Sequence, residues 1–139
     1  MDQAEIARVE TYLRKAFGAP DLKLRARGSD DADLLRGTEK LGGISKDDDE
    51  GELSYFVSVS VPRAPGAKKD APIDDAERAR LQTALRDAMG SPALQVRARP
   101  RKTDSAEVYV ADDFIGTVSA DEDEGPVLTM SILDIDLEE

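Results

Sequence analysis

The phrase TYLRKAFGAPDLKLRAR at residues 11–27 returns as TALRDAMGSPALQVRAR at residues 83–99. When residues 4–27 are aligned with residues 76–99, fourteen of the 24 positions are identical. Chance would give roughly two identities, because most residue types account for only a few per cent of an average protein. The sequence therefore contains a tandem duplication, and this repeat decides the fold.

The duplication continues beyond these two segments at a slightly larger offset. The extended alignment pairs DADLL (31–35) with SAEVY (105–109), Gly42 with Gly116, and LSYFVSVSV (53–61) with VLTMSILDI (127–135). A stretch rich in Pro, Gly, Ala and Lys separates the copies and has the composition of a linker. We therefore predict a first, diverged repeat at 1–61, a linker at 62–73 and a second repeat at 74–139.

Each repeat begins with the signals of a capped helix. Asp2 and Asp74 are N-cap candidates, and each is followed three residues later by Glu. Apolar residues then recur at helical spacing until Gly18 and Gly90, which suit a left-handed C-cap. The pattern predicts one amphipathic helix at the start of each repeat.

Strand patterns follow each helix. LKLRAR (22–27) alternates apolar and basic residues, AEVYVADDFIGTVS (106–119) predicts a hairpin around Asp-Asp, and VLTMSILDIDL (127–137) predicts a last strand. LLRGTEKLGGI (34–44) in the first repeat is poorer in strand-forming residues, so we expect its hairpin to be shorter. The sequence predicts an α+β fold: a tandem repeat of a helix followed by a four-stranded antiparallel meander.

The duplication also predicts how the repeats associate. A unit of about 65 residues buries only about 60% of its unfolded surface and is marginally stable alone. A four-stranded sheet with one helix leaves a face and two edges open. We therefore expect the repeats to pack as a pseudo-twofold pair within a monomer, as a fused homodimer would.

Composition narrows the functional classes. The 139 residues carry a net charge of −11, which disfavours binding to nucleic acid or to an anionic membrane. The chain has no Cys, hence no disulfide or thiolate chemistry, and no His, the commonest general base. The acidic N-terminus MDQAEIARVE is unlike a signal peptide, and no apolar run approaches ~18 residues. We expect a cytoplasmic protein without a membrane segment.

The second repeat resembles a known family. The Ala76–Gly90 helix, SAEVYVADDFIG (105–116) and SILDIDLEE (131–139) are similar to a family of short bacterial proteins, about one repeat long, of unknown function. The resemblance covers nearly all of 73–139 and extends weakly over 1–61. It supports the fold unit and implies no activity, cofactor or catalytic residue.

Two acidic segments are the candidates for metal binding. DDDEG (47–51) and DEDEG (121–125) cluster carboxylates, but neither has the alternate-position ligand spacing of a calcium loop. We interpret them as solvated turns and expect no metal and no cofactor. The sequence also lacks the phosphate-loop, nucleophile-elbow and zinc-protease motifs, so we expect no enzyme activity.

Basic side chains alternate along the first predicted strand of each repeat. Because alternate residues of a strand point to the same side, we expect four arginine side chains to lie on one face of the sheet: Arg25, Arg27, Arg97 and Arg99. Such guanidinium rows suit phosphate or carboxylate groups. The alternative is cross-strand pairing with acidic neighbours such as Glu107 or Asp134.

These observations favour a non-catalytic protein-interaction module. If Val108 and Val110 face the helix, Tyr109 stands on the opposite face near the second arginine row, so we predict that Tyr109, Arg97 and Arg99 contact a partner protein. The alternative is an acidic nucleic-acid mimic or inhibitor, for which the alternating ILDIDLEE (132–139) would supply carboxylates. An enzyme ranks third.

Overall fold

Eight strands in the described part of the chain form one antiparallel sheet. The structure, a computed structural model, describes residues 1–48, 51–68, 71–121 and 125–137. Its elements are α1 (Gln3–Phe17), β1 (Leu22–Arg27), β2 (Asp31–Arg36), β3 (Glu39–Asp47), β4 (Ser54–Ser60), α2 (Asp75–Met89), β5 (Leu94–Ala98), β6 (Ser105–Val110), β7 (Asp113–Asp121), β8 (Gly125–Leu133) and the 3-10 helix η2 (Asp134–Leu137). The predicted α+β class, with a helix and four strands in each repeat, is confirmed.

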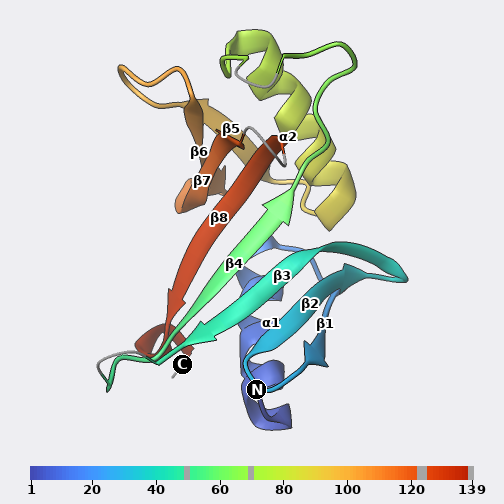
Figure 1. The fold of residues 1–139 in the computed structure, drawn as a ribbon, viewed down its shortest axis with the longest axis vertical. Coiled ribbons are helices and arrows are strands. Elements are labelled where there is room, and N and C mark those ends of the chain that lie inside the picture. Colours follow the sequence, from blue (N-terminus) through green and yellow to red (C-terminus); the bar gives the residue numbers. More distant parts are fainter. Residues whose placement is uncertain (49–50, 69–70, 122–124, 138–139) are drawn as a thin grey trace.

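The strand order is symmetric about the centre of the sheet (Figure 1). The order β1-β2-β3-β4-β8-β7-β6-β5 places the last strands of the two repeats side by side. They pair from Ser54 with Leu133 to Ser60 with Val127. The pair Ser58–Thr129 lies next to the middle of this ladder, and a pseudo-twofold axis through this pair relates the repeats.

Both helices begin and end where their capping residues predict. Asp2 accepts from the Glu5 N–H at 2.8 Å, and Asp74 accepts from the Glu77 N–H at 2.9 Å. Gly18 and Gly90 end the helices in the left-handed region, at φ 59° and 68°. The predicted caps are therefore confirmed.

One face of the sheet carries the core, and both helices cover that face. Inward side chains of both helices and of strands from both repeats form a single cluster that includes Val9, Leu13, Phe17, Leu34, Ile44, Val57, Leu81, Leu85, Met89, Val108, Val118, Leu128 and Ile132. Alternate strand residues point to the opposite face, which the helices leave open. We call this uncovered side of the sheet the open face, which is accessible to solvent.

Helix side chains close the two outer edges of the sheet. In each repeat an arginine donates to a carbonyl of the first strand, and a Glu or Gln one turn earlier accepts from a strand N–H. The bonds are Arg14 to Leu22 O (2.8 Å), Leu24 N to Glu10 (2.9 Å), Arg86 to Leu94 O (2.6 Å) and Val96 N to Gln82 (3.1 Å). One carbonyl and one N–H group on each edge strand are thus satisfied, which leaves fewer groups to template aggregation.

The two repeats are also joined at the C-terminal ends of their helices. The Ser91 hydroxyl donates to the Phe17 carbonyl in the buried region between α1 and α2. The Arg36 guanidinium donates to the Asp87 carbonyl near the end of α2. The repeats therefore share hydrogen bonds as well as the core.

The predicted alignment of the last strands is wrong by three residues. Ile44 pairs with Val57, and the equivalent Val118 pairs with Leu128, so Val57 corresponds to Leu128 at an offset of 71 rather than 74. The cause is the length of the connection: six residues separate Asp47 from its partner Ser54 in the first repeat, whereas three separate Asp121 from its partner Gly125 in the second. Pairing geometry, not residue similarity, fixes the register.

The hairpin of the first repeat is not shortened, contrary to expectation. β2 and β3 have six and nine residues, the same lengths as β6 and β7. Leu34, Leu41 and Ile44 are buried and replace the stronger strand formers of the second repeat. Packing against the core therefore overrides strand propensity here. The hairpin predicted around Asp-Asp is confirmed, with Ala111 and Asp112 in its turn.

The predicted last strand is also too long. β8 ends at Leu133, and residues 134–137 form η2 instead of continuing the ladder. Leu137 is buried and η2 packs against α1, so tertiary contact ends the strand. The acidic residues of this segment therefore do not form one face of a strand.

Candidate functional site

The open face of the second repeat brings two of the three predicted partner-binding residues into contact. Tyr109 lies on β6, and the guanidinium carbon of Arg97 on β5 lies 4.1 Å from the centre of its ring. The Arg97 guanidinium also donates to Gln95 and pairs with Asp112 at 2.8 Å. A guanidinium over an exposed ring is worth about 0.5–1 kcal/mol, so the two side chains support each other.

The third predicted residue, Arg99, lies just beyond the end of β5. Its guanidinium donates to the Ser105 hydroxyl at 2.9 Å rather than contacting the Tyr109 ring. Of the acidic neighbours that the alternative named for the second arginine row, Glu107 lies opposite Arg97 in the ladder, but neither it nor Asp134 forms the ion pair. Arg97 pairs with Asp112 in the hairpin turn, whereas Glu107 accepts from the Tyr109 hydroxyl at 3.3 Å and Asp134 lies in η2.

The first repeat shows the cross-strand pairing that the alternative predicted. Arg25, Arg27 and Lys40 contact the carboxylate of Asp33 at 3.0, 3.3 and 3.3 Å. Asp33 is only 5% exposed, and its hydrogen bond from Arg25, followed by the contacts of Lys40, holds its pKa below the ordinary value despite burial. This end of the open face is therefore a self-paired ionic cluster.

A continuous row of residues connects the two ends of the open face. Successive cross-strand neighbours in this row are Arg25, Asp33, Gly43, Ser58, Thr129, Thr117, Glu107 and Arg97. The centre of the row is small and hydroxyl-bearing, and each end has a carboxylate followed by arginine. The open face thus carries small side chains in the middle and charged side chains at its ends.

The sheet opens between β7 and β8, a feature that the sequence reasoning missed. The two strands pair only from Thr117–Thr129 to Asp121–Gly125, although β7 extends back to Asp113 and β8 forward to Leu133. A bulge in β7 against β6 leaves Ile115 as an extra residue beside Gly116. A Cβ on Gly116 would lie 2.3 Å from the Thr129 carbonyl oxygen, so the strands meet this closely only because the residue is glycine.

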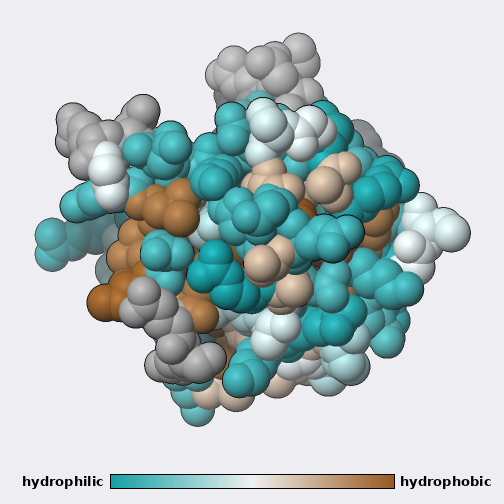
Figure 2. Space-filling model, turned by 90° about the horizontal axis from the view of Figure 1, so that it is seen from below, coloured by the Kyte–Doolittle hydropathy of each residue, from teal (hydrophilic) through white to brown (hydrophobic). Residues whose placement is uncertain are grey.

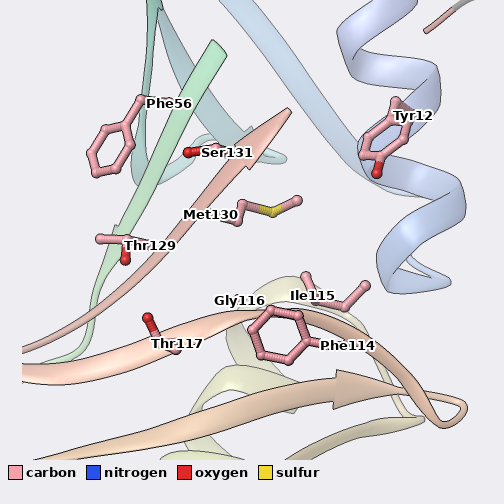
Figure 3. Close-up of a pocket in the computed structure, with 9 residues that line it drawn as sticks. All are labelled: Tyr12, Phe56, Phe114, Ile115, Gly116, Thr117, Thr129, Met130 and Ser131. Atoms are coloured by element: carbon pink, nitrogen blue, oxygen red, sulfur yellow. The ribbon is translucent and has the colours of Figure 1, made fainter. Parts of the chain in front are cut away.

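A groove of about 440 Å³ occupies this opening. Its walls are Tyr12, Phe56, Phe114, Ile115, Gly116, Thr117, Thr129, Met130 and Ser131. Figure 3 shows Met130 directed toward the side where Tyr12 of α1 lies, whereas Ser131 points toward Phe56. Three of the six aromatic residues of the chain line this one groove.

The groove is continuous with the predicted partner-binding residues. Phe114 is 54% exposed, and its ring meets the edge of the Tyr109 ring at 5.6 Å between centroids and an angle of 74°. Phe56, on the opposite wall, is 47% exposed. Contiguous exposed apolar surface marks interaction sites, whereas apolar residues scattered singly over a surface are ordinary. The site therefore runs from Arg97 and Tyr109 through Phe114 into the groove.

The chemistry of the groove is suited to binding. Its lining side chains are apolar, aromatic or hydroxyl-bearing. Activation of a hydroxyl such as those of Thr117, Thr129 and Ser131 requires an adjacent general base, and the lining residues include no carboxylate, amine or imidazole. In the described ranges, no group of three or more His, Cys, Asp or Glu residues is placed to hold a metal ion. The acidic segments at 47–51 and 121–125 extend partly outside the described residues.

The fold and this site define a class of duplicated α+β proteins in which two helix-plus-four-strand units share one sheet and leave its second face open. The chain belongs to the family described as protein of unknown function (DUF3126), whose model matches it twice, over residues 5–63 and 77–136. The resemblance stated for the second repeat therefore holds for both. No curated protein and no solved structure matches the chain. Within the described residues, no helix is long and apolar enough to cross a bilayer.

Proposed function

We propose that this protein is a non-catalytic, monomeric interaction module of the cytoplasm that binds another protein through the open face of its second repeat. The observation that carries the proposal is the continuity of the Arg97–Tyr109 stack with the aromatic groove beside Phe114. An apolar side chain of the partner would enter the groove, and a carboxylate would meet Arg97 and Arg99. Aromatic and arginine side chains dominate the binding energy of protein interfaces.

The exposed rings would contribute substantially to the binding free energy of such an interface. A buried phenylalanine removes about 150–250 Å² from water, and Phe56 and Phe114 are each about half exposed before a partner binds. At about 25 cal/mol per Å², covering the exposed half of one ring contributes roughly 2–3 kcal/mol. Two such rings offset much of the cost of association.

The charges of the open face argue for a protein partner over nucleic-acid mimicry. A mimic needs carboxylates in rows at roughly phosphate spacing. On this face Asp33 and Asp112 are paired with cations, and hydroxyl and phenyl side chains occupy the centre. This arrangement supports ordinary protein recognition.

Paired substitutions at equivalent positions of the two repeats test the proposal. Tagged wild-type protein, Tyr109→Ala, Arg97→Ala and the first-repeat control Arg25→Ala are used to capture partners from native lysate. The captured protein is identified, purified and titrated by calorimetry. We expect Tyr109→Ala and Arg97→Ala to weaken binding roughly tenfold or more, and Arg25→Ala less than about twofold.

Thermal unfolding of the same variants distinguishes binding from folding. Tyr109 is only half-buried, so Tyr109→Ala should move the unfolding midpoint by no more than a few degrees, by about the amount expected for a small loss of surface packing. If Tyr109→Ala unfolds the protein, Tyr109 belongs to the core and the assignment is wrong. Equal affinities for all four proteins would also contradict it.

A further inference from the structure

A small cleft between α1 and η2 lies on the helix side of the sheet. Its volume is about 50 Å³, and its lining residues are Arg8, Thr11, Tyr12, Lys15, Asp136 and Leu137. The four α1 residues recur every three or four positions and therefore share one face of the helix. η2 belongs to the end of the molecule where both termini lie in Figure 1, and Figure 2 shows that hydrophilic residues cover most of that end.

Two cations of the cleft have no carboxylate partner among the described residues. Arg8 and Lys15 are both exposed, and neither takes part in an ion pair in that part of the chain. Glu10, one of the two carboxylates of α1, pairs with Arg14 at 3.0 Å. The other is Glu5, which binds side chains of β3 and β4 instead. Both cations therefore remain available to an external anion.

One carboxylate also lines the cleft. Asp136 Oδ2 accepts from the Leu133 N–H at 3.2 Å, so this side chain is part of the turn that forms η2. Over the lining residues, two cations and one carboxylate give the cleft a net charge of +1. The whole protein carries −11, so the charge of the cleft is opposite in sign to that of the molecule. An anionic group is the ligand that this local charge favours.

The second repeat shows the same arginine in a neutralised state. Arg80 occupies the position of Arg8 in α2, and Glu77 holds its guanidinium through two bonds of 2.6 and 2.9 Å. In the first repeat the equivalent carboxylate, Glu5, turns instead to a lysine of β3 and a tyrosine of β4, each at 2.8 Å. Identical Glu and Arg residues therefore form a closed ion pair in α2 and leave an unpaired arginine in α1.

Sequence differences between the repeats account for this contrast. Lys46 and Tyr55, which draw Glu5 away from Arg8, are replaced by alanine and proline at the equivalent positions of the second repeat. In addition, Lys15 stands where α2 has Asp87. The first repeat has thus released one cation and gained another on the same helix face.

We propose that this cleft binds a phosphate group through the Arg8 guanidinium, the Thr11 hydroxyl and the Lys15 ammonium. Charge-assisted bonds from guanidinium and ammonium groups are the strong contacts to phosphate, and the hydroxyl between them adds a donor. A cleft of about 50 Å³ has room for roughly a few water molecules, which suits one phosphate group. The inference goes beyond the proposed function, because the cleft lies on the opposite side of the sheet from Tyr109 and Arg97.

Titration of the isotope-labelled full chain with inorganic phosphate, followed by amide NMR spectra at constant ionic strength, tests the site. We expect saturable shifts centred on residues 8–15 of α1 and 134–137 of η2, with a Kd of about 1 mM. Acetate should bind at least roughly fivefold more weakly, because it offers fewer oxygens and less charge. Shifts that stay linear up to about 20 mM phosphate, or that centre on other residues, would overturn the proposal.

Two double variants separate the cleft from general positive charge. Arg8→Gln with Lys15→Gln removes both cations, whereas Arg101→Gln with Lys102→Gln removes one arginine and one lysine at exposed positions between β5 and β6. We expect the cleft variant to weaken phosphate binding at least roughly tenfold and the control less than about twofold. All four side chains are exposed, so circular dichroism should show both variants folded. Similar losses in the two would mean binding to diffuse charge and would contradict the site.

A third variant changes the charge of the cleft in the opposite direction. Asp136→Asn keeps an oxygen for the Leu133 N–H and removes a negative charge, so phosphate should bind roughly threefold more tightly. Weaker binding would overturn the proposal.

The source of the phosphate group is either a phosphorylated side chain or a small compound. A phosphoserine peptide with alanine neighbours that binds at least roughly tenfold more tightly than inorganic phosphate indicates the first, and equal or weaker binding indicates the second. Both results support the site only if Arg8→Gln with Lys15→Gln abolishes them, and equal binding of the unphosphorylated peptide would contradict it. Failure of these tests leaves the proposed function standing, because capture through Tyr109 and Arg97 does not involve the cleft.

Discussion

The substitution Glu5→Gln should lower the free energy of unfolding far more than removal of a carboxylate near a helix N-terminus normally does. Glu5 is 8% exposed, its Oε2 lies 2.8 Å from both the Lys46 ammonium and the Tyr55 hydroxyl, and its Oε1 accepts from the Asp2 N–H at 3.1 Å. The Lys46 contact is the main cause, and with the bonds from Tyr55 and Asp2 it lowers the pKa of Glu5 from 4.5 to about 2, against the opposing effect of burial.

The size of the effect follows from that pKa. The difference between 4.5 and about 2 corresponds to about 3 kcal/mol of unfolding free energy at ~1.36 kcal/mol per pKa unit. Because the folded pKa is depressed, this stabilisation is fully present above about pH 4.5 and is lost as the pH falls toward about 2. Glu5→Gln keeps the side-chain oxygen for the capping bond, so it should remove about 2–3 kcal/mol at neutral pH and much less near pH 3.

Urea unfolding followed by circular dichroism at neutral and acidic pH measures both quantities. The matched control is Glu77→Gln in the second repeat, where the carboxylate pairs with Arg80 one helical turn away. Such an i,i+3 surface pair contributes under about 1 kcal/mol. Equal losses for the two variants, or a loss for Glu5→Gln that does not shrink in acid, would refute the reasoning.

Three further predictions concern the sheet. Gly42→Ala and Gly116→Ala should each cost more than about 3 kcal/mol in urea unfolding, because the added Cβ would lie 1.9 Å from the Ser58 oxygen and 2.3 Å from the Thr129 oxygen. Gly28→Ala, whose Cβ meets nothing within 4 Å, should cost only about 1 kcal/mol for its positive φ, and a larger loss there would undermine the comparison. Arg86→Ala should remove about 1–2 kcal/mol and accelerate amide exchange in β5, because it frees the Leu94 carbonyl at the sheet edge; unchanged exchange would contradict this. Residues 74–139 expressed alone should dimerise or unfold, because β8 loses its ladder with β4, and sedimentation showing a stable folded monomer would contradict the pseudo-dimer argument.

The repeat made most of the fold predictable. Caps, glycines and apolar spacing act within a few residues, so Asp2, Gly18 and their counterparts Asp74 and Gly90 locate the helices without tertiary information. Strand alternation likewise placed Tyr109 opposite the helix-facing valines. What depends on neighbouring strands was not predictable, because a pattern such as Leu-Asp-Ile-Asp-Leu suits a strand and a 3-10 turn equally until packing on α1 decides.

The groove was missed for a similar reason. It depends on the bulge at Ile115, which shifts Phe114 onto the open face beside Tyr109, and a simple alternation count cannot detect an inserted residue. One signal was available in the alignment. Gly42 and Gly116 occupy equivalent positions, and a glycine inside a strand pattern indicates a bulge or a close backbone approach. Reading these glycines structurally would have predicted the bulge, though not the aromatic lining.

The two repeats make different side-chain contacts at equivalent positions. The pair Tyr109 and Phe114 corresponds to Leu35 and Lys40, of which Leu35 is nearly buried and Lys40 contacts Asp33. Conversely, Lys46 and Tyr55, which bind Glu5, correspond by strand pairing to Ala120 and Pro126. A dimer of identical chains would have to carry both sets at both sites. Fusion of the repeats removes that constraint, so the first repeat can carry the ionic contacts of Glu5 and Asp33 while the second carries the ring contact between Tyr109 and Phe114.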